Sequence, residues 1–165
     1  MAIAAAVLVT TLGGDDDQGD TLTSSQPNGY TMQYPSNWRA LPAAELENLS
    51  PQPLALIRRK DGEGLVIIRE AGRAPGDFTS FTSQLTKRLD GRLPDFQKRT
   101  SRRVKIRAGR ALFYSYIRRD KGTVNTIVLV PAGKRSYTIN TVSGGRAKDA
   151  AREIATMILS FDVPH

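Results

Sequence analysis

The 165-residue sequence contains no cysteine, and its single histidine is the last residue, His165. Without cysteine the chain has no disulfide, no thiolate metal site, no cysteine nucleophile and no cysteine to carry a lipid anchor. A terminal histidine is usually incidental, so we do not expect His165 to act in catalysis. These absences exclude several classes of site, and they leave the redox compartment open.

Long apolar runs are also lacking. Ala2–Leu12 is apolar, but it is shorter than the roughly 20 residues of a membrane span and matches the hydrophobic part of a signal peptide. No Lys or Arg precedes this run, as would follow if translation began further upstream. We expect residues 1–13 to be an export or anchor segment; the alternative is a frayed N-terminal element of a cytoplasmic protein. Residues 14–26, rich in Gly, Ser, Thr and Asp, predict a flexible acidic linker.

Two segments have the spacing of amphipathic helices. The first begins at Asp77 and ends at Asp90-Gly91, and the second follows Ser143-Gly144-Gly145. Each carries apolar residues three and four positions apart, which line one face of a helix. The residues expected to be buried are Phe78, Phe81, Leu85, Leu89, Ala147, Ala150, Ala151, Ile154, Ile158 and Phe161. The residues of the second helix expected in solvent are Lys148, Asp149, Arg152 and Glu153.

Between the helices, apolar and polar residues alternate as they do in strands. The expected strands are Arg103–Arg107, Leu112–Ile117, Val124–Val130 and Tyr137–Thr141. The connections are short and each contains glycine, so neighbouring strands should pair antiparallel. Val124–Val130 is the most apolar and should be central, ending at Pro131, which lacks a backbone donor.

Shorter strands are expected upstream of the first helix. One of them has its large residues on one face: Tyr30, Met32 and Tyr34. Leu54–Ile57 and Leu65–Ile68 should pair around the turn at residues 60–64. Trp38 and Tyr34 should be buried beside the closing helix or the meander. The sequence thus predicts one α+β domain over residues 27–165, an antiparallel sheet of about six to seven strands packed with two main helices.

The order of these segments resembles a known fold. A Y-x-x-x-Y-P-x-x-W strand comes first, then a hairpin, the helix DFTSFTSQLTKRL, the motif LPDFQ, the meander and the closing AREIATMILSFDV. This arrangement is similar to the PsbP-like fold, an α/β/α sandwich shared with a Ran-interacting import factor, actinobacterial envelope lipoproteins and type VI secretion effector chaperones. The resemblance covers residues 27–163. It implies an accessory role in binding other proteins, and it carries over no catalytic residue.

Charge is distributed unevenly along the chain. Residues 1–26 hold four Asp and no basic residue, which leaves 24 basic against twelve acidic side chains, or +12, on the remainder. The candidate partner or anion-binding surface comprises Arg99, Arg103, Lys105, Arg107 and Arg110. Alternation places Arg103, Lys105 and Arg107 on one strand face. They are candidates to bind an acidic protein, anionic lipid or cell-wall polymer; the alternative is a solvated face that prevents edge-to-edge aggregation.

The sequence favours a binding module over an enzyme. No carboxylate pair is evident for acid–base catalysis, and no base is placed to activate a serine. No cofactor or metal is predicted, and nucleic acid is disfavoured because no aromatic residue interrupts the basic cluster. The expected role is a non-catalytic accessory module of the cell envelope. Its partner is expected to be another envelope protein, contacted outside the cytoplasmic membrane; the alternative location is the cytoplasm.

Overall fold

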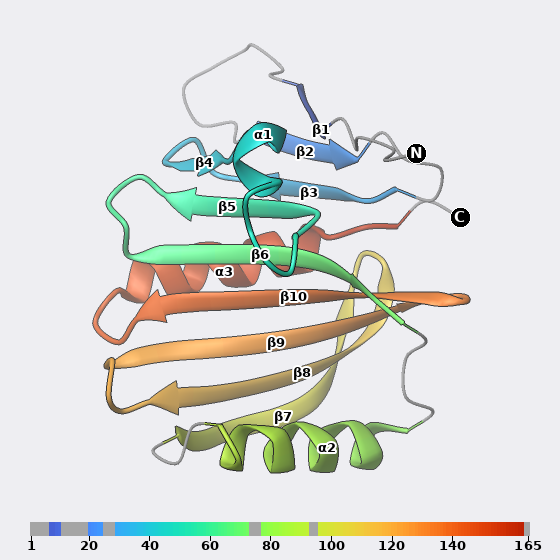
Figure 1. Ribbon diagram of the computed structural model, residues 1–165, viewed down its shortest axis with the longest axis vertical. Helices are drawn as coiled ribbons and strands as arrows, with labels where there is room; N and C mark the ends of the chain where they lie inside the picture. Colours follow the sequence, from blue (N-terminus) through green and yellow to red (C-terminus); the bar gives the residue numbers. More distant parts are fainter. Residues whose placement is uncertain (1–6, 11–19, 25–28, 73–76, 93–95, 164–165) are drawn as a thin grey trace.

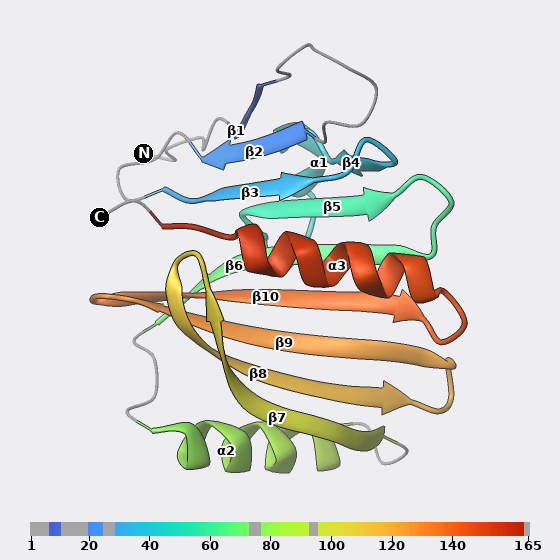
Figure 2. The same cartoon turned by 180° about the vertical axis from the view of Figure 1, so that it is seen from behind.

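The structure, a computed structural model, describes residues 7–10, 20–24, 29–72, 77–92 and 96–163. A seven-stranded antiparallel sheet lies between two long helices, α2 (Phe78–Asp90) and α3 (Lys148–Ser160), which pack on opposite faces of it (Figures 1 and 2). The strands of this sheet are β4 (Trp38–Ala40), β5 (Ala55–Arg59), β6 (Gly64–Ala71), β7 (Phe96–Ile106), β8 (Gly109–Arg118), β9 (Thr123–Ala132) and β10 (Arg135–Gly144). The predicted α+β class and α/β/α layering are confirmed.

The strand order is β4-β5-β6-β10-β9-β8-β7. The predicted meander is confirmed as β7 to β10, because each strand pairs antiparallel with the next along the chain. Its turns contain Gly109, Gly122 and Gly133, all at positive φ, a conformation that glycine adopts without a steric penalty. Pro131 lies inside β9 rather than at its end. Pairing between β8 and β9 stops at Leu129, so the missing N–H of Pro131 costs no ladder bond to β8.

Helix α2 forms where the sequence predicts it. Its N-cap is Asp77, whose carboxylate accepts a hydrogen bond from the backbone N–H of Ser80 at 2.7 Å. Phe81, Leu85 and Leu89 are buried in a small core with side chains from the sheet: Tyr114, Tyr116 and Leu129. α2 therefore packs at the β7–β8–β9 end of its sheet face, and Figure 1 shows it beside β7.

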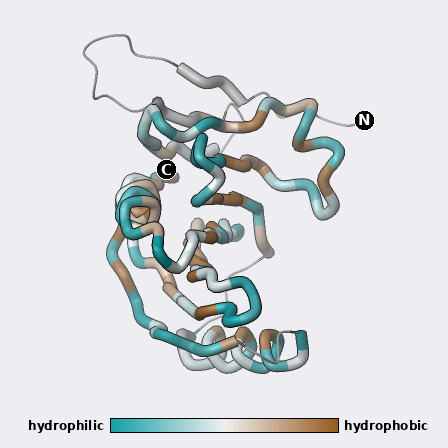
Figure 3. Tube along the Cα trace, turned by 90° about the vertical axis from the view of Figure 1, so that its left-hand side faces the viewer, coloured by the Kyte–Doolittle hydropathy of each residue, from teal (hydrophilic) through white to brown (hydrophobic). Residues whose placement is uncertain are grey.

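The main core lies on the other face, under α3. Trp38 and Tyr34 are 1% and 3% exposed, which confirms the prediction that both are buried. The ring of Tyr30 stacks on that of Phe161, at the C-terminal end of α3, with 5.5 Å between centroids. The curled end of β7 and β8 reaches the same helix end (Figures 2 and 3), where the N–H groups of Arg107 and Ala108 donate to backbone carbonyls.

The buried face of α3 differs from the predicted one at two positions. Ala151 is exposed, whereas Met157 is fully buried, because the helix is rotated so that Ala150, Ile154, Met157 and Ile158 face the sheet. Glu153 was expected in solvent, but it is only partly exposed and forms hydrogen bonds with residues of the β4–β5 region. Its neighbours are described below.

A smaller sheet adjoins the N-terminal side of the large one. β1 (Val7–Thr10), β2 (Asp20–Ser24) and β3 (Thr31–Tyr34) pair antiparallel in that order. Asp20–Ser24 falls within the segment expected to be a linker, and the structure instead pairs it with β3, residue for residue. Thr31 also bridges to Asp162 just after α3. Val7–Thr10 falls within the expected anchor segment, and the structure pairs it with β2. The remaining residues of the expected anchor and linker lie outside the described ranges. A short helix, α1 (Ala43–Leu46), covers part of β5.

Candidate functional site

Four of the five predicted basic residues cluster at the end of the β7–β8 hairpin. All five are exposed: Arg99, Arg103, Lys105, Arg107 and Arg110. Lys105 lies directly opposite Arg110 in the ladder, and Arg103 is two residues before Lys105, so these three share one face of the hairpin. Val104 and Ile106 occupy the other face, towards the main core, which confirms their predicted orientation.

Arg107 and Arg99 are placed differently from the other three. Arg107 lies in the turn that follows β7 and continues the cluster to the tip. Arg99 lies at an irregularity of β7, where the pairing register shifts between Lys98 and Thr100, and it is roughly 13 Å along the strand from Arg103. We call the group of Arg103, Lys105, Arg107 and Arg110 the basic hairpin surface, and Arg99 is outside it.

One carboxylate lies beside this surface. This carboxylate belongs to Asp77. Hydrogen bonds donated by the backbone N–H and side-chain hydroxyl of Ser80 lower its pKa, and the positive charge of Arg103 lowers it further. Among the described residues, Lys105, Arg107 and Arg110 form no ion pair. Arginines elsewhere do: Arg39 with Glu45, Arg118 with Asp120 and Arg135 with Glu70. The tip of the hairpin therefore carries three cations that have no ion-pair partner among the described residues.

A second feature is a cavity of about 310 Å³ between α2 and the sheet, which we call the α2 groove. The described residues that line it are Ala71, Gly72, Phe81, Gln84, Leu85, Arg88, Ile127, Leu129, Ser136, Thr138 and Asn140. It exists because α2 covers β7–β9 but not the neighbouring part of β10 and β6 (Figure 1). Sequence reasoning missed it. The only signal was the alternation of Ser136, Thr138 and Asn140 with the buried Tyr137 and Ile139, which is also typical of a solvent-facing strand side.

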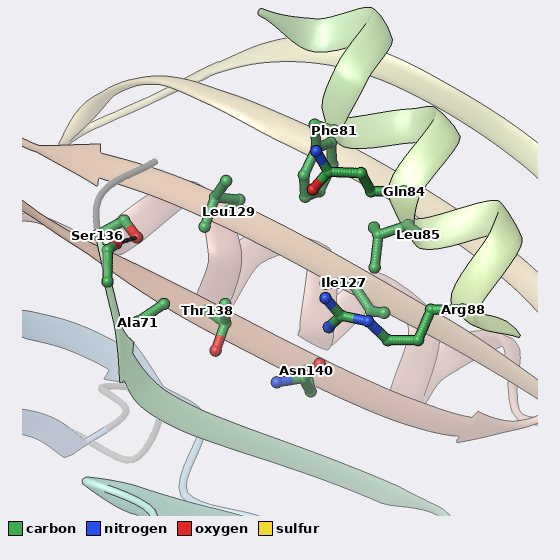
Figure 4. A pocket seen from close by; sticks show the side chains of 11 residues that line it. Ala71, Phe81, Gln84, Leu85, Arg88, Ile127, Leu129, Ser136, Thr138 and Asn140 are labelled. Atoms are coloured by element: carbon green, nitrogen blue, oxygen red, sulfur yellow. Dashed lines mark hydrogen bonds between the residues drawn. The ribbon is translucent and has the colours of Figure 1, made fainter. Parts of the chain in front are cut away.

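Polar side chains from two elements converge on the α2 groove. Arg88 extends from α2 over Ile127 towards Asn140 of β10, with Thr138 further along the same strand (Figure 4). Within the described part of the chain, the side chains of Gln84, Arg88, Thr138 and Asn140 take part in no hydrogen bond or ion pair. Ser136 donates its hydroxyl to the carbonyl of Gly72. Arg88 is the only charged residue among the described lining residues.

A third polar cluster joins α3 to β4 and β5. The carboxylate of Glu153 accepts hydrogen bonds from Trp38 Nε1 at 2.7 Å, Arg59 Nε at 2.9 Å and Asn37 Nδ2 at 3.0 Å. Burial raises its pKa, but the three donors and the charge of Arg59 outweigh burial and hold the pKa below its usual value. A carboxylate held ionised by three protein donors fixes the helix to the sheet and is poorly suited to exchange protons in catalysis.

Other sequence features have structural roles. The tyrosines at 30, 34, 114 and 116 are buried with Trp38 in the two cores rather than lining a pocket. The turn at Ser143–Arg146 uses its amides internally, because Gly144 N–H donates to Glu63 O and Gly145 N–H to Gly122 O. Over the described ranges, no three His, Cys, Asp or Glu side chains gather where they could hold a metal ion. Nor does any described helix have the length and apolar character of a membrane span.

Known structures share this fold. Cyanobacterial PsbP (CyanoP) from Synechocystis sp. PCC 6803 superposes with a TM-score of 0.64 at 13% identity, over 94% of this chain and 98% of that one. LpqN, described as involved in cell envelope biogenesis of Mycobacterium tuberculosis, superposes with a TM-score of 0.56 at 13% identity, over 97% and 92%. A Bacteroides thetaiotaomicron protein superposes with a TM-score of 0.52 at 14% identity, and the match covers 82% of this chain and 45% of that chain.

These likenesses show that the chain has the PsbP-like fold, as its sequence predicts. At such identities they define the architecture and carry over no site residue. No family model matches the sequence, and no curated protein matches it.

Proposed function

We propose that this protein is a non-catalytic accessory module that acts outside the cytoplasmic membrane and binds an acidic surface of another cell-envelope protein. The fold supports the class, since one protein of the same architecture, LpqN, is described as involved in cell envelope biogenesis. The basic hairpin surface supports the mode of binding. The single observation that carries it is the unpaired state, among the described residues, of Lys105, Arg107 and Arg110 side by side at one end of the sheet.

The charge of this surface is suited to recognition. A single exposed ion pair contributes little binding free energy. Several cations together create an electrostatic field that steers an acidic partner and sets its orientation. The hairpin tip is held rigidly, because the N–H groups of Arg107 and Ala108 donate to the carbonyls of Leu159 and Phe161. A partner therefore meets a hairpin backbone that is already in place, and the entropy cost of ordering falls mainly on the Lys and Arg side chains.

A pull-down with two matched variants tests this proposal. Lys105, Arg107 and Arg110 are all changed to Glu, whereas Arg103 is retained because its charge contributes to lowering the pKa of Asp77, the N-cap of α2. The control changes Arg58, Lys60 and Lys134 to Glu; these are exposed and lie on other turns and strands. Both variants carry the same net charge. We expect the wild type and the control, but not the hairpin variant, to retain a partner from an envelope extract, with retention falling as salt increases. Equal retention by both variants would refute the assigned surface.

Anionic lipid or wall polymer is a second candidate ligand for the same surface. The observation that favours it is Leu159, which is 56% exposed and lies where its carbonyl accepts from Arg107 N–H. An exposed leucine beside a group of cations can insert at a headgroup boundary. Co-sedimentation with vesicles of phosphatidylglycerol and phosphatidylcholine, compared with phosphatidylcholine alone, distinguishes this candidate. Binding to the anionic vesicles that requires both Leu159 and the three cations would favour it over a protein partner.

The proposed location is tested separately from the binding surface. An export or anchor segment at residues 1–13 remains an expectation, and most of it lies outside the described residues. Fractionation of native cells with an antibody against the folded domain should place the protein with the membrane or outside it. Recovery in the cytoplasmic fraction would contradict the location, whatever the basic hairpin surface binds.

A further inference from the structure

We propose that the α2 groove is a binding site for a small organic monocarboxylate with an apolar body. This inference is independent of the basic hairpin surface, since the two sites use different residues. The groove is built from one helix and two central strands rather than from loops: α2, β9 and β10 provide most of its described lining. Its volume of about 310 Å³ lies at the lower end of the range for ligand pockets, which begins at about 300 Å³.

The charge of the groove selects an anion. Arg88 is the only ionised side chain among its described lining residues, and none of these residues carries a carboxylate to offset that charge. Arg69 adds a second guanidinium on the same sheet face, since it pairs directly with Thr138 across β6 and β10. Its Nε is buried without a hydrogen-bond partner in the described structure. A carboxylate suits this setting because a guanidinium can donate two parallel hydrogen bonds to it.

The remaining polar groups fit the same ligand. Gln84 and Asn140 each supply an amide N–H, and Thr138 supplies a hydroxyl; none of these is used within the described part of the protein. Asn140 and Thr138 of β10 lie on the wall opposite Arg88 and can join it in binding a carboxylate, whereas Gln84 lies further along α2, beside Phe81 (Figure 4). Convergent polar side chains with unused hydrogen-bonding capacity are typical of a ligand site.

The other end of the groove is apolar. There Phe81 of α2 faces Leu129 of the sheet, and Leu85 and Ile127 lie between these two residues and Arg88 (Figure 4). This surface suits a short hydrocarbon or a single aromatic ring. A volume of about 310 Å³ corresponds to about ten water volumes, which suits a ring with a short acid chain. The ligand class is therefore a compact aryl or alkyl monocarboxylate.

Titration with hydrocinnamate, followed by two-dimensional amide NMR on the full chain, tests the proposal. We expect saturable shifts confined to the amides of α2, β9 and β10, with a dissociation constant in the millimolar range or tighter. The neutral amide of the same acid is the matched ligand control. It should bind at least about tenfold more weakly, because it cannot take the charge-assisted bonds to Arg88.

Two exposed basic residues on α2 provide a matched pair of variants. Arg88→Gln should weaken hydrocinnamate binding at least about tenfold, whereas Lys87→Gln, which removes the same charge from a residue outside the lining, should leave it nearly unchanged. Equal effects of the two changes would overturn the proposal, as would equal binding of acid and amide, or no saturable shift in these elements. Binding of a short peptide with a C-terminal phenylalanine but not of hydrocinnamate would also overturn it, in favour of a peptide C-terminus.

Discussion

Gly64 and Trp38 illustrate at the residue scale how a core position depends on its neighbour. A Cβ atom on Gly64 would lie well inside van der Waals contact with ring carbons of Trp38, which is itself almost fully buried. Gly64→Ala should therefore displace the indole and lower the free energy of unfolding by about 1–3 kcal/mol, measured by chemical denaturation. Gly72→Ala is the control, since nothing lies within 4 Å of its added Cβ.

A double-mutant cycle makes this explanation falsifiable. In a Trp38→Phe background the smaller ring leaves room near Gly64, so Gly64→Ala should cost less there than in the wild type. The same penalty in both backgrounds would mean that backbone conformation, and not the indole, requires glycine. Trp38→Ala itself should cost about 3–5 kcal/mol, because it removes a large buried side chain.

Glu153 gives a prediction about pH. Its pKa is lower in the folded protein than in the unfolded chain, where a glutamate titrates near about 4.3. Its contribution to stability is therefore complete above the unfolded pKa and is lost as pH falls through the folded pKa. Glu153→Gln should lower the free energy of unfolding by about 1–3 kcal/mol at pH near 7, and this difference should shrink on acidification.

The matched control for Glu153 is Glu47→Gln. Glu47 is exposed and its side chain has no hydrogen bond or ion pair among the described residues, so its loss should change stability little at any pH. A wild-type minus Glu153→Gln difference that stays constant from neutral to acidic pH would contradict the assignment of Glu153 as an ionised acceptor. Sequence alone could not reveal this role. Glu153 has the helical position of a solvent residue, and its three donors come from segments about a hundred residues away.

At the scale of elements, α2 is attached to the sheet by few side chains. Leu85 is buried between α2 and the sheet. Together with Phe81 and Leu89 it forms the buried apolar face of α2. Leu85→Ala should destabilise the protein by about 2–5 kcal/mol, with amides of α2 exchanging with solvent faster than those of β9 and β10. Ser83→Ala on the exposed side of the same helix is the control. Uniform acceleration of exchange across all elements would show instead that α2 unfolds only with the whole domain.

Elements with regular periodicity could be predicted, and irregular ones could not. The stripe of α2 and the alternation at Val104 and Ile106 lead directly to the observed burial. The first half of β7 was missed because its run from Gln97 to Thr100 is exposed and includes the register shift, so no alternating apolar pattern marks it as a strand. β2 was missed for another reason: its strand pairing depends on β3, a partner that local composition does not identify.

At the scale of the whole molecule, the two candidate sites follow from how far each helix extends over the sheet. α2 covers one end of its face and leaves the groove beside β10. The β7–β8 end of the sheet curls towards α3 (Figures 2 and 3), and the basic hairpin surface lies at the tip of that hairpin, with Arg103, Lys105 and Arg110 on the side away from the main core. The composition of the basic surface could be predicted because alternation alone places Arg103 and Lys105 on one face. The groove could not, because its walls are brought together only by the tertiary placement of α2 against β10.

Whole-molecule charge gives the last prediction. The chain carries +8, and the change of Lys105, Arg107 and Arg110 to Glu lowers this to +2, since each replacement shifts the charge by two. These side chains are exposed and form no ion pair among the described residues, so their reversal should leave the melting temperature within a few degrees of the wild type. Because salt screens repulsion among like charges, added salt should raise the melting temperature of the wild type more than that of the variant. A large loss of stability in the variant, or identical salt responses, would show that these cations take part in the fold rather than forming a free surface.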